Sequence, residues 1–209
     1  MVKSLFILIL AMLLSGCSGS SFHKNSHYDY KHNIDITKNS VLSYTPSNKK
    51  YTGAVILVYH RFGDRTGTSK NINAKTFRQQ LQFLRDHKFK VRPLDFVIDD
   101  IKNGKSLDKT VVITIDGAYH NIATVAHPLL KSFNFPYTIF VNTKDIGQFP
   151  FMTWETLKHL STHELVTIGS HSHQQTNLIN GLNKEQIKSD IIVASQLISN
   201  KLGIIPTLY

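Results

Sequence analysis

Two kinds of hydrophobic pattern alternate along residues 54–209. Short strand-like runs of four to six residues are separated by longer stretches in which apolar residues recur every three or four positions. Continuous apolar runs are typical of parallel strands that are covered on both faces, and strands alternating with helices predict parallel βαβ units. We therefore expect an α/β domain whose strands lie near residues 54–59, 89–92, 110–115, 137–141 and 165–168.

Helix boundaries follow from capping residues next to the periodic stretches. Asn73 is expected to cap a helix whose core face is Phe77, Leu81 and Leu84, at positions i, i+4 and i+7. A last helix is expected to begin after Asn183 and end at Gly203. Its inward residues are predicted to be Ile187, Ile191, Ala194 and Ile198. The remaining helices are expected over residues 94–101 and 122–132, and after a Thr153 cap.

The N-terminus predicts an exported lipoprotein. The apolar run of residues 5–14 is shorter than the roughly 20 residues that span a bilayer, so it indicates a signal-peptide core. Leu14-Ser15-Gly16-Cys17 follows with the spacing of a bacterial lipobox, which predicts diacylglyceryl attachment at Cys17. An ordinary cleaved signal with a stray cysteine is the alternative. Ser18 follows the predicted lipidated cysteine, and it resembles the residue found there in lipoproteins that are sorted to the outer membrane. This predicts that the chain lies on the periplasmic face of the outer membrane.

The segment after the predicted cleavage site indicates a tether. Residues 18–50 are polar, show no apolar periodicity and end in the turn signal TPSNKK. Histidines within it are expected to be solvated, because a tether offers no surrounding groups to orient metal ligands. The predicted organisation is therefore a signal peptide over residues 1–16, a lipidated tether over 17–50 and one domain over 51–209.

Charge favours anionic partners. The chain has 24 Lys and Arg against 14 Asp and Glu, a formal net charge of +10. For an exported chain the anionic candidates are phospholipid headgroups or acidic glycans, and nucleic acid is not an expected partner. The basic residues are scattered, so a solvated surface is the plainer interpretation. The single cysteine allows no internal disulfide.

Polar residues follow two of the predicted strands where each strand ends. Residues 110–118 read TVVITIDGA and residues 168–176 read IGSHSHQQT, each an apolar run followed by carboxylate, imidazole and small side chains. Because α/β proteins build sites at the carboxyl ends of their strands, both segments are candidate site elements.

These two segments resemble the first two motifs of the polysaccharide deacetylases, which remove N- or O-acetyl groups from glycans. Val58-Tyr59-His60, PYTIFVNT and FMTWETLKHL also resemble family segments in their order and spacing. The resemblance covers most of residues 54–209. It implies the family's distorted (β/α) barrel, with an N-acetylated cell-envelope or biofilm polysaccharide as the substrate.

The resemblance also implies a metal site with altered ligands. The family's first motif supplies a general base and a metal aspartate, and its second motif supplies two histidine ligands to a divalent metal such as zinc. Asp116 falls at the base, Gly117 at the metal aspartate, and His171 and Gln175 at the two histidines. Glycine has no donor atom and a neutral amide is a poor zinc ligand, so one ligand of three is retained.

Several nearby residues have two interpretations. His173 is expected to share a face with His171 on an extended strand, and either it or His120 is a candidate substitute ligand. The alternatives are local packing for His173 and solvent exposure for His120. Asp116 is alternatively a helix N-cap. His60 is a candidate for lining the site, with a hydrogen-bonded core histidine as the alternative. Tyr119 and Trp154 are candidates for stacking on sugar, and packing is the plainer interpretation of both.

The C-terminus departs from the family as well. The family's next strand carries an Arg-x-Pro-Tyr-Gly-like motif whose backbone amide helps hold the oxyanion, and later segments bring an acid histidine. The sequence ends at Tyr209 without them. We expect an incomplete barrel with two unpaired edges, a sixth strand beginning at Thr207 and a separate C-terminal fragment as a possible partner.

Two functional hypotheses follow. The first is a lipid-anchored polysaccharide deacetylase, C-terminally truncated and impaired by its missing ligands. The second is a non-catalytic envelope lipoprotein that binds or scaffolds glycan with the same site. A decaying gene whose product does not accumulate is a third.

Overall fold

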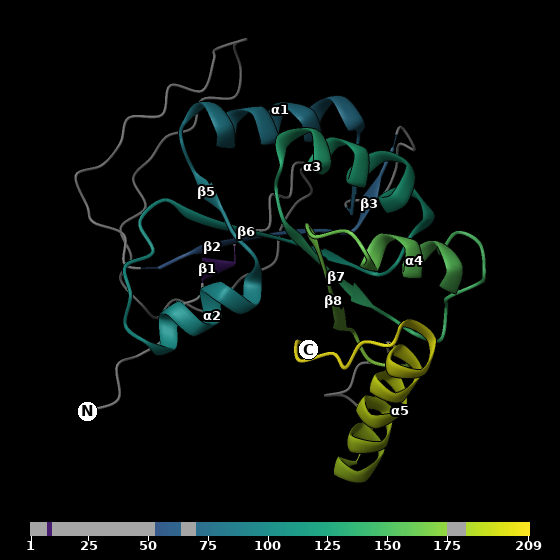
Figure 1. The fold of residues 1–209 in the computed structure, drawn as a ribbon. Helices are drawn as coiled ribbons and strands as arrows, with labels where there is room; N and C mark the ends of the chain where they lie inside the picture. Colours follow the sequence, from purple (N-terminus) through teal and green to yellow (C-terminus); the bar gives the residue numbers. More distant parts are fainter. Residues whose placement is uncertain (1–7, 10–52, 64–69, 175–182) are drawn as a thin grey trace, which may run out of the picture. The chain divides into compact units, whose positions relative to one another are not determined.

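The computed structural model describes residues 8–9, 53–63, 70–174 and 183–209 (Figure 1). Its main sheet is parallel, with the order β1-β2-β6-β7-β8 and β5 beside the first residues of β6. This confirms the predicted α/β class. The strands of this sheet are β1 (Leu8–Ile9), β2 (Val55–Tyr59), β5 (Lys90–Val91), β6 (Thr110–Asp116), β7 (Tyr137–Val141) and β8 (Val166–Ser170).

β6 is the central strand of the sheet. Val111 pairs with Val55 of β2 on one edge and with Val91 of β5 on the other. Farther along β6, Asp116 pairs with Phe140 of β7. Every residue of β6 except Asp116 is buried, as expected of a parallel strand with both faces covered. The last residue of the central strand is therefore the first to reach solvent.

The first helix confirms its sequence prediction in detail. α1 spans Ala74–Asp86, and the Asn73 side chain accepts a 2.8 Å hydrogen bond from the Thr76 amide. The buried side chains of α1 are Phe77, Leu81 and Leu84. Cap and core face are both specified within a few residues, which is why they could be predicted locally.

The other predicted helices are also present. They are α2 (Leu94–Lys102), a π-helical turn η1 (Ile122–Ala126) continuing into α3 (His127–Phe133), α4 (Trp154–Ser161) and α5 (Lys184–Leu202). α5 begins with a capping box between Asn183 and Gln186 and ends at Gly203. No helix among these described segments is long and apolar enough to span a membrane.

One prediction for α5 was wrong in part. Ala194 and Ile198 are buried as expected, together with Leu202, but Ile187 and Ile191 are only half-buried. α5 packs on α4 and β8 through its second half, and its first turns extend away from α4 (Figure 1). The apolar period of a helix predicts its inward face but not how far the neighbouring elements extend.

The sheet carries a core on each face. Ile113 and Ile115 of β6 belong to a large cluster with residues of α1, α3 and α4, whereas Val112 belongs to a smaller cluster with Leu94 and Val97 of α2. Adjacent strand residues point to opposite faces, so α2 covers the face opposite α1 and α3 (Figure 1).

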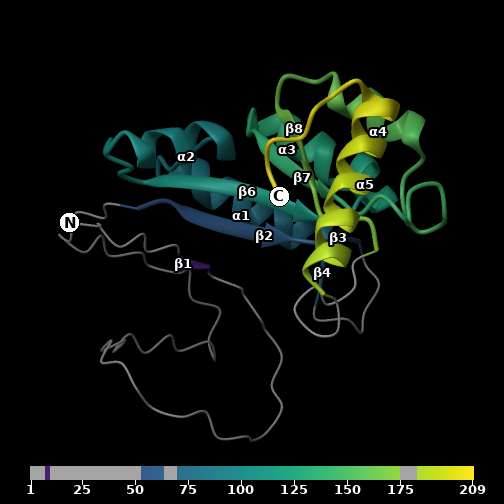
Figure 2. The same ribbon diagram turned by 90° about the horizontal axis from the view of Figure 1, so that it is seen from below.

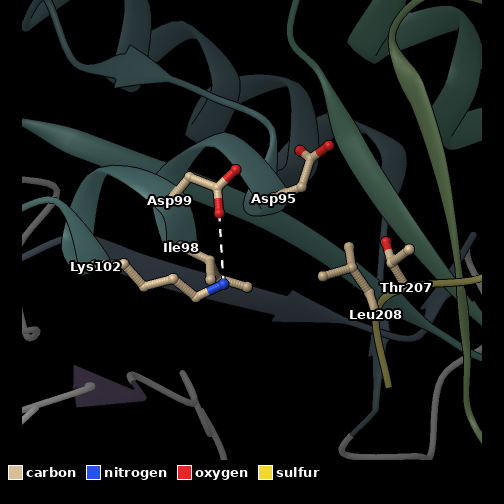
Figure 3. Close-up of a pocket in the computed structure, with 6 residues that line it drawn as sticks. All are labelled: Asp95, Ile98, Asp99, Lys102, Thr207 and Leu208. Carbon is tan, nitrogen blue, oxygen red and sulfur yellow. Dashed lines mark hydrogen bonds and ion pairs between the residues drawn. The ribbon is translucent and has the colours of Figure 1, made fainter.

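The second face also holds a cavity of about 280 Å³ between α2 and the C-terminal segment (Figure 3). Lys102 Nζ lies 3.5 Å from Asp99 Oδ1 at this cavity. None of the residues predicted to form the functional site is among those that line it, which are Asp95, Ile98, Asp99, Lys102, Thr207 and Leu208.

The C-terminal segment lies beside β8 (Figure 2). Residues 204–209 form no helix or strand, but the Leu208 carbonyl accepts a 2.9 Å hydrogen bond from the Ser170 amide. The sixth strand predicted from Thr207 is therefore not formed, although this segment occupies part of the edge of β8. A regular strand needs more consecutive pairings than this single contact provides.

Two short pairings were not predicted. β3 (Arg61–Phe62) and β4 (Asn71–Ile72) form a separate two-stranded sheet. β1 lies within the predicted signal-peptide core and pairs with Val55 and Ile56 of β2. The predicted cleavage before Cys17 would remove β1 from the mature chain. The predicted division into a signal peptide over residues 1–16, a tether over 17–50 and a domain over 51–209 stays a prediction. Two-residue strands carry no hydrophobic period from which to predict them.

Candidate functional site

His60 and Asp116 meet at the carboxyl end of the sheet. Tyr59 pairs with Ile115 in the β2–β6 register, so the residues that follow them leave neighbouring strands together. His60 Nε2 lies 3.8 Å from Asp116 Oδ2, with side chains 28% and 23% exposed. The next helical segment begins at His120 and continues as the turn η1 from Ile122, so Asp116 is not its N-cap. The site interpretation of both residues agrees with this contact and stays a prediction.

Burial lowers the pKa of His60 below its ordinary value. The Asp116 carboxylate opposes this effect, while the positive charges of Lys70, His171 and Arg61 add to it. His60 is therefore held toward its neutral form by its surroundings, and only Asp116 favours the imidazolium.

His171 reaches the same end of the sheet through β7. The Phe140 carbonyl accepts a 2.9 Å hydrogen bond from the Gly117 amide, and the next carbonyl, that of Val141, accepts one of 2.8 Å from the His171 amide. Two consecutive residues of β7 thus hold the segments that follow β6 and β8. The two strand-end motifs therefore reach the same end of the sheet, and His171 is close enough to His60 for its charge to lower the pKa of His60.

An aromatic ring fills the space beside Gly117, the residue that falls at the family's metal aspartate. Gly117 has a φ of +76°, and a Cβ atom added there would lie 2.8 Å from Cε2 of Tyr119. The Tyr119 ring stacks on Phe151 with centroids 4.6 Å apart, and the Tyr119 hydroxyl accepts a 3.0 Å hydrogen bond from Arg61. The Arg61 guanidinium carbon lies 4.5 Å from the ring centroid. Any side chain at position 117 must displace this anchored ring.

The predicted shared face of His171 and His173 was wrong. β8 ends at Ser170, and Ser172 has a φ of +68°, so the alternation of an extended strand does not continue through this segment. The His173 Nδ1 atom shares a 2.8 Å hydrogen bond with the Thr143 hydroxyl. This contact matches the local-packing interpretation of His173.

The remaining candidates make other contacts or fall outside the described residues. His120 is exposed, and its amide donates to the Pro150 carbonyl. Trp154 is half-buried and packs against the large core. Gln175, Cys17 and the tether fall outside the described residues. Sequence reasoning missed Arg61, Thr143 and Asp190, which act through contacts that no local pattern reveals.

The described residues do not fit a three-ligand metal site. They contain no group of three or more His, Cys, Asp or Glu side chains arranged to hold a metal ion. Gly117 offers no donor, the Tyr119 ring fills the adjacent space, and the motif's last position carries an amide. This donor set is too poor for the tetrahedral nitrogen and oxygen coordination that zinc prefers.

Comparison with known sequences identifies the family. The sequence profile described as polysaccharide deacetylase matches residues 103–209. The chain belongs to the polysaccharide deacetylase family. It is 30% identical over 146 residues to the Bacillus subtilis protein named "Putative polysaccharide deacetylase YxkH", covering 69% of this chain and 51% of that protein.

A second similar sequence is the poly-beta-1,6-N-acetyl-D-glucosamine N-deacetylase of Staphylococcus aureus (strain MRSA252). It is 26% identical over 172 residues, which cover 72% of this chain and 58% of that enzyme. The chain thus spans about half the length of these curated relatives.

Solved structures show the same fold. IcaB from Ammonifex degensii superposes with a TM-score of 0.68 at 21% identity, covering 75% of this chain and 72% of that one. The deacetylase PplD of Streptococcus pyogenes, solved in complex with acetate, gives a TM-score of 0.65 at 20% identity, with coverages of 72% and 70%. These likenesses confirm the (β/α)-barrel type of fold, of which this chain forms part.

Proposed function

We propose that this chain is an envelope lipoprotein of the polysaccharide deacetylase family that binds N-acetylated polysaccharide at His60, Asp116 and His171. We further propose that its deacetylase activity is impaired. The observation that carries the proposal is the Tyr119 ring, which lies where a side chain at position 117 would extend. The names of the staphylococcal relatives support a poly-N-acetylglucosamine type of ligand.

The retained side chains suit sugar binding. Asp116 accepts hydrogen bonds, and a neutral His60 can donate from one ring nitrogen and accept at the other. Hydroxyl and acetamido groups of a pyranose offer the complementary donors and acceptors. The half-buried position of both side chains, at the carboxyl ends of β2 and β6, allows such contacts while keeping part of the surrounding water away.

Hydrolysis of an acetamide demands more than these groups provide. The acetyl oxygen gains negative charge during water attack and needs a cation or preorganised donors, each donor contributing about 3 kcal/mol. The family is generally metal-dependent, and a bound metal supplies that charge. Because the described donor set does not fit a metal, Asp116 lacks the positive partner that would let it activate water for this step.

A non-catalytic scaffold is the second candidate. The Arg61 guanidinium over the Tyr119 ring favours it, because its N–H groups can donate hydrogen bonds to sugar hydroxyls without any chemical step. In both versions we propose that the chain is attached to the membrane through Cys17. We also propose that it lies on the periplasmic face of the outer membrane.

One set of measurements tests these versions. The purified full chain is assayed for zinc content, for acetate release from β-1,6-linked N-acetylglucosamine oligomers and for binding of the same oligomers. Binding with little zinc and slow acetate release supports the impaired deacetylase, and binding with no release above the Asp116→Asn variant supports the scaffold. One equivalent of zinc with rapid release contradicts the proposed impairment, and absence of binding contradicts the proposed ligand.

A further inference from the structure

The segment after β8 carries two histidines on a bend of its own. Ser172 is a buried residue with a φ of +68°, and the backbone leaves the direction of β8 at this point. The bend turns two consecutive amides, those of His173 and Gln174, toward α5. No strand pairing satisfies these two donors, so they depend on a partner from elsewhere in the fold.

Asp190 of α5 is that partner. Its Oδ2 atom accepts a 2.8 Å hydrogen bond from the His173 amide, and its Oδ1 atom accepts one of 3.0 Å from the Gln174 amide. Each oxygen of one carboxylate therefore binds one amide, in charge-assisted bonds that are stronger than neutral ones. Asp190 lies 16 and 17 residues beyond these amides, so its contacts tie α5 to the end of β8.

The opposite side of the bend is held by the residues that follow β7. The Thr143 amide donates to the Ser172 carbonyl at 3.3 Å, and the Lys144 amide donates to the His173 carbonyl at 3.1 Å. The Thr143 hydroxyl shares its hydrogen bond with the His173 ring. The bend is thus fixed from β7 by neutral bonds and from α5 by a single carboxylate.

We propose that Asp190 is a positioning residue that sets the direction in which His171 faces the His60–Asp116 pair. This inference rests on the proposed function, since it assigns His171 to the ligand-binding site. The His171 amide is anchored to Val141 on one side and continues into the clamped bend on the other. Releasing the bend frees the backbone immediately after His171, and its side chain loses a fixed orientation.

The test compares Asp190→Asn and Asp190→Glu in the full chain. An asparagine side chain has one accepting oxygen and turns its NH2 group toward the second amide, so it can satisfy only one of the two donors. Glutamate keeps both acceptors and the charge. Two controls are matched in α5: Glu185→Gln removes a carboxylate from the exposed first turn, and Asn183→Ala weakens the helix through its cap without touching the bend.

In Asp190→Asn we expect hydrogen exchange of the His173 and Gln174 amides to accelerate about tenfold or more. The imidazole resonances of His171 should shift, and affinity for N-acetylglucosamine oligomers should fall on the order of tenfold, as for other residues that orient a ligating side chain. Asp190→Glu should retain more of the affinity than Asp190→Asn. Neither control should move the His171 resonances.

Unchanged His171 resonances in Asp190→Asn overturn the proposal, whether or not the wild-type chain binds glycan. Affinity that falls equally in Asn183→Ala also overturns it, because the effect would then come from the stability of α5 alone. If the wild-type chain binds no oligomer while the His171 resonances still respond to Asp190→Asn, the proposed ligand is wrong and the positioning role stands.

Discussion

A Cβ atom at Gly117 would lie 2.8 Å from Cε2 of Tyr119. The missing metal ligand is thus accompanied by a second change, because the space beside it is filled by a ring anchored by Arg61 and Phe151. Restoring the donor alone does not restore the site. The φ of +76° adds backbone strain to any side chain placed there.

We predict that Gly117→Asp with Gln175→His gains little zinc affinity. The new carboxylate must displace the Tyr119 ring and adopt a left-handed φ, at a strain of about 1–3 kcal/mol. Adding Tyr119→Ala should free the space and raise zinc affinity. Calorimetric zinc titration and thermal unfolding of both variants measure this. Stoichiometric zinc binding by the variant that retains Tyr119 would show that the ring is no obstacle.

His60 should titrate below its ordinary pKa of 6.5. Because its folded pKa is below the unfolded value, the unfolded chain takes up the proton first as the pH falls. The stabilising contribution of neutral His60 is therefore complete above 6.5 and is lost as the pH decreases toward the lowered folded value. Asp116→Asn should lower the pKa further, since the Asp116 charge is what raises it.

Proton resonances of the His60 ring, followed against pH, measure both effects. Asp99→Asn is the matched control, because Asp99 is an exposed carboxylate of α2 that contributes nothing to the pKa shift of His60. A His60 pKa that rises or stays constant in Asp116→Asn would mean that the 3.8 Å contact does not form in solution.

Asp100 should make the chain sensitive to acid. Its carboxylate binds Lys105 at 2.8 Å and Arg92 at 2.6 Å, and these hydrogen bonds hold its pKa below the ordinary 3.8. A lowered folded pKa means that its stabilising contribution is present above 3.8 and is lost as the pH falls through the folded value. Asp100→Asn should reduce the stability of the chain near neutral pH. The stability of this variant should also fall less steeply than that of the wild type as the pH is lowered into acid.

Urea unfolding midpoints of Asp100→Asn and wild type, measured from neutral pH down into acid, test this expectation. Asp99→Asn again serves as the control, since its exposed ion pair with Lys102 contributes little to stability. Parallel pH curves for wild type and Asp100→Asn would show that this network does not govern acid stability.

Cys17 should carry a lipid. Cys17→Ser is expected to abolish incorporation of labelled palmitate and to move the chain from the membrane fraction to the soluble envelope fraction, because the remaining tether is polar. Ser18→Asp leaves the cysteine in place and tests sorting between membranes. Membrane retention of Cys17→Ser would mean that another part of the chain binds the membrane.

Features set by neighbouring residues could be predicted. The Asn73 cap, the buried face of α1 and the Asn183 cap of α5 each depend on residues within a few positions of one another. The strand-end motifs placed Asp116 and His171 at one edge of the sheet, since parallel strands end together. The His173 prediction failed because it assumed that β8 continues past Ser170, where the backbone bends at Ser172.

The amino-acid sequence by itself determined the order of strands and helices, their caps and the family to which the chain belongs, because these depend on local periodicity and short motifs. Only the tertiary structure decided what surrounds those motifs: the Tyr119 ring against Gly117, the 3.8 Å approach of His60 to Asp116 and the Asp190 carboxylate on the bend after β8. The physical reason is that such contacts join side chains distant in sequence, and their geometry depends on sheet register and helix packing together.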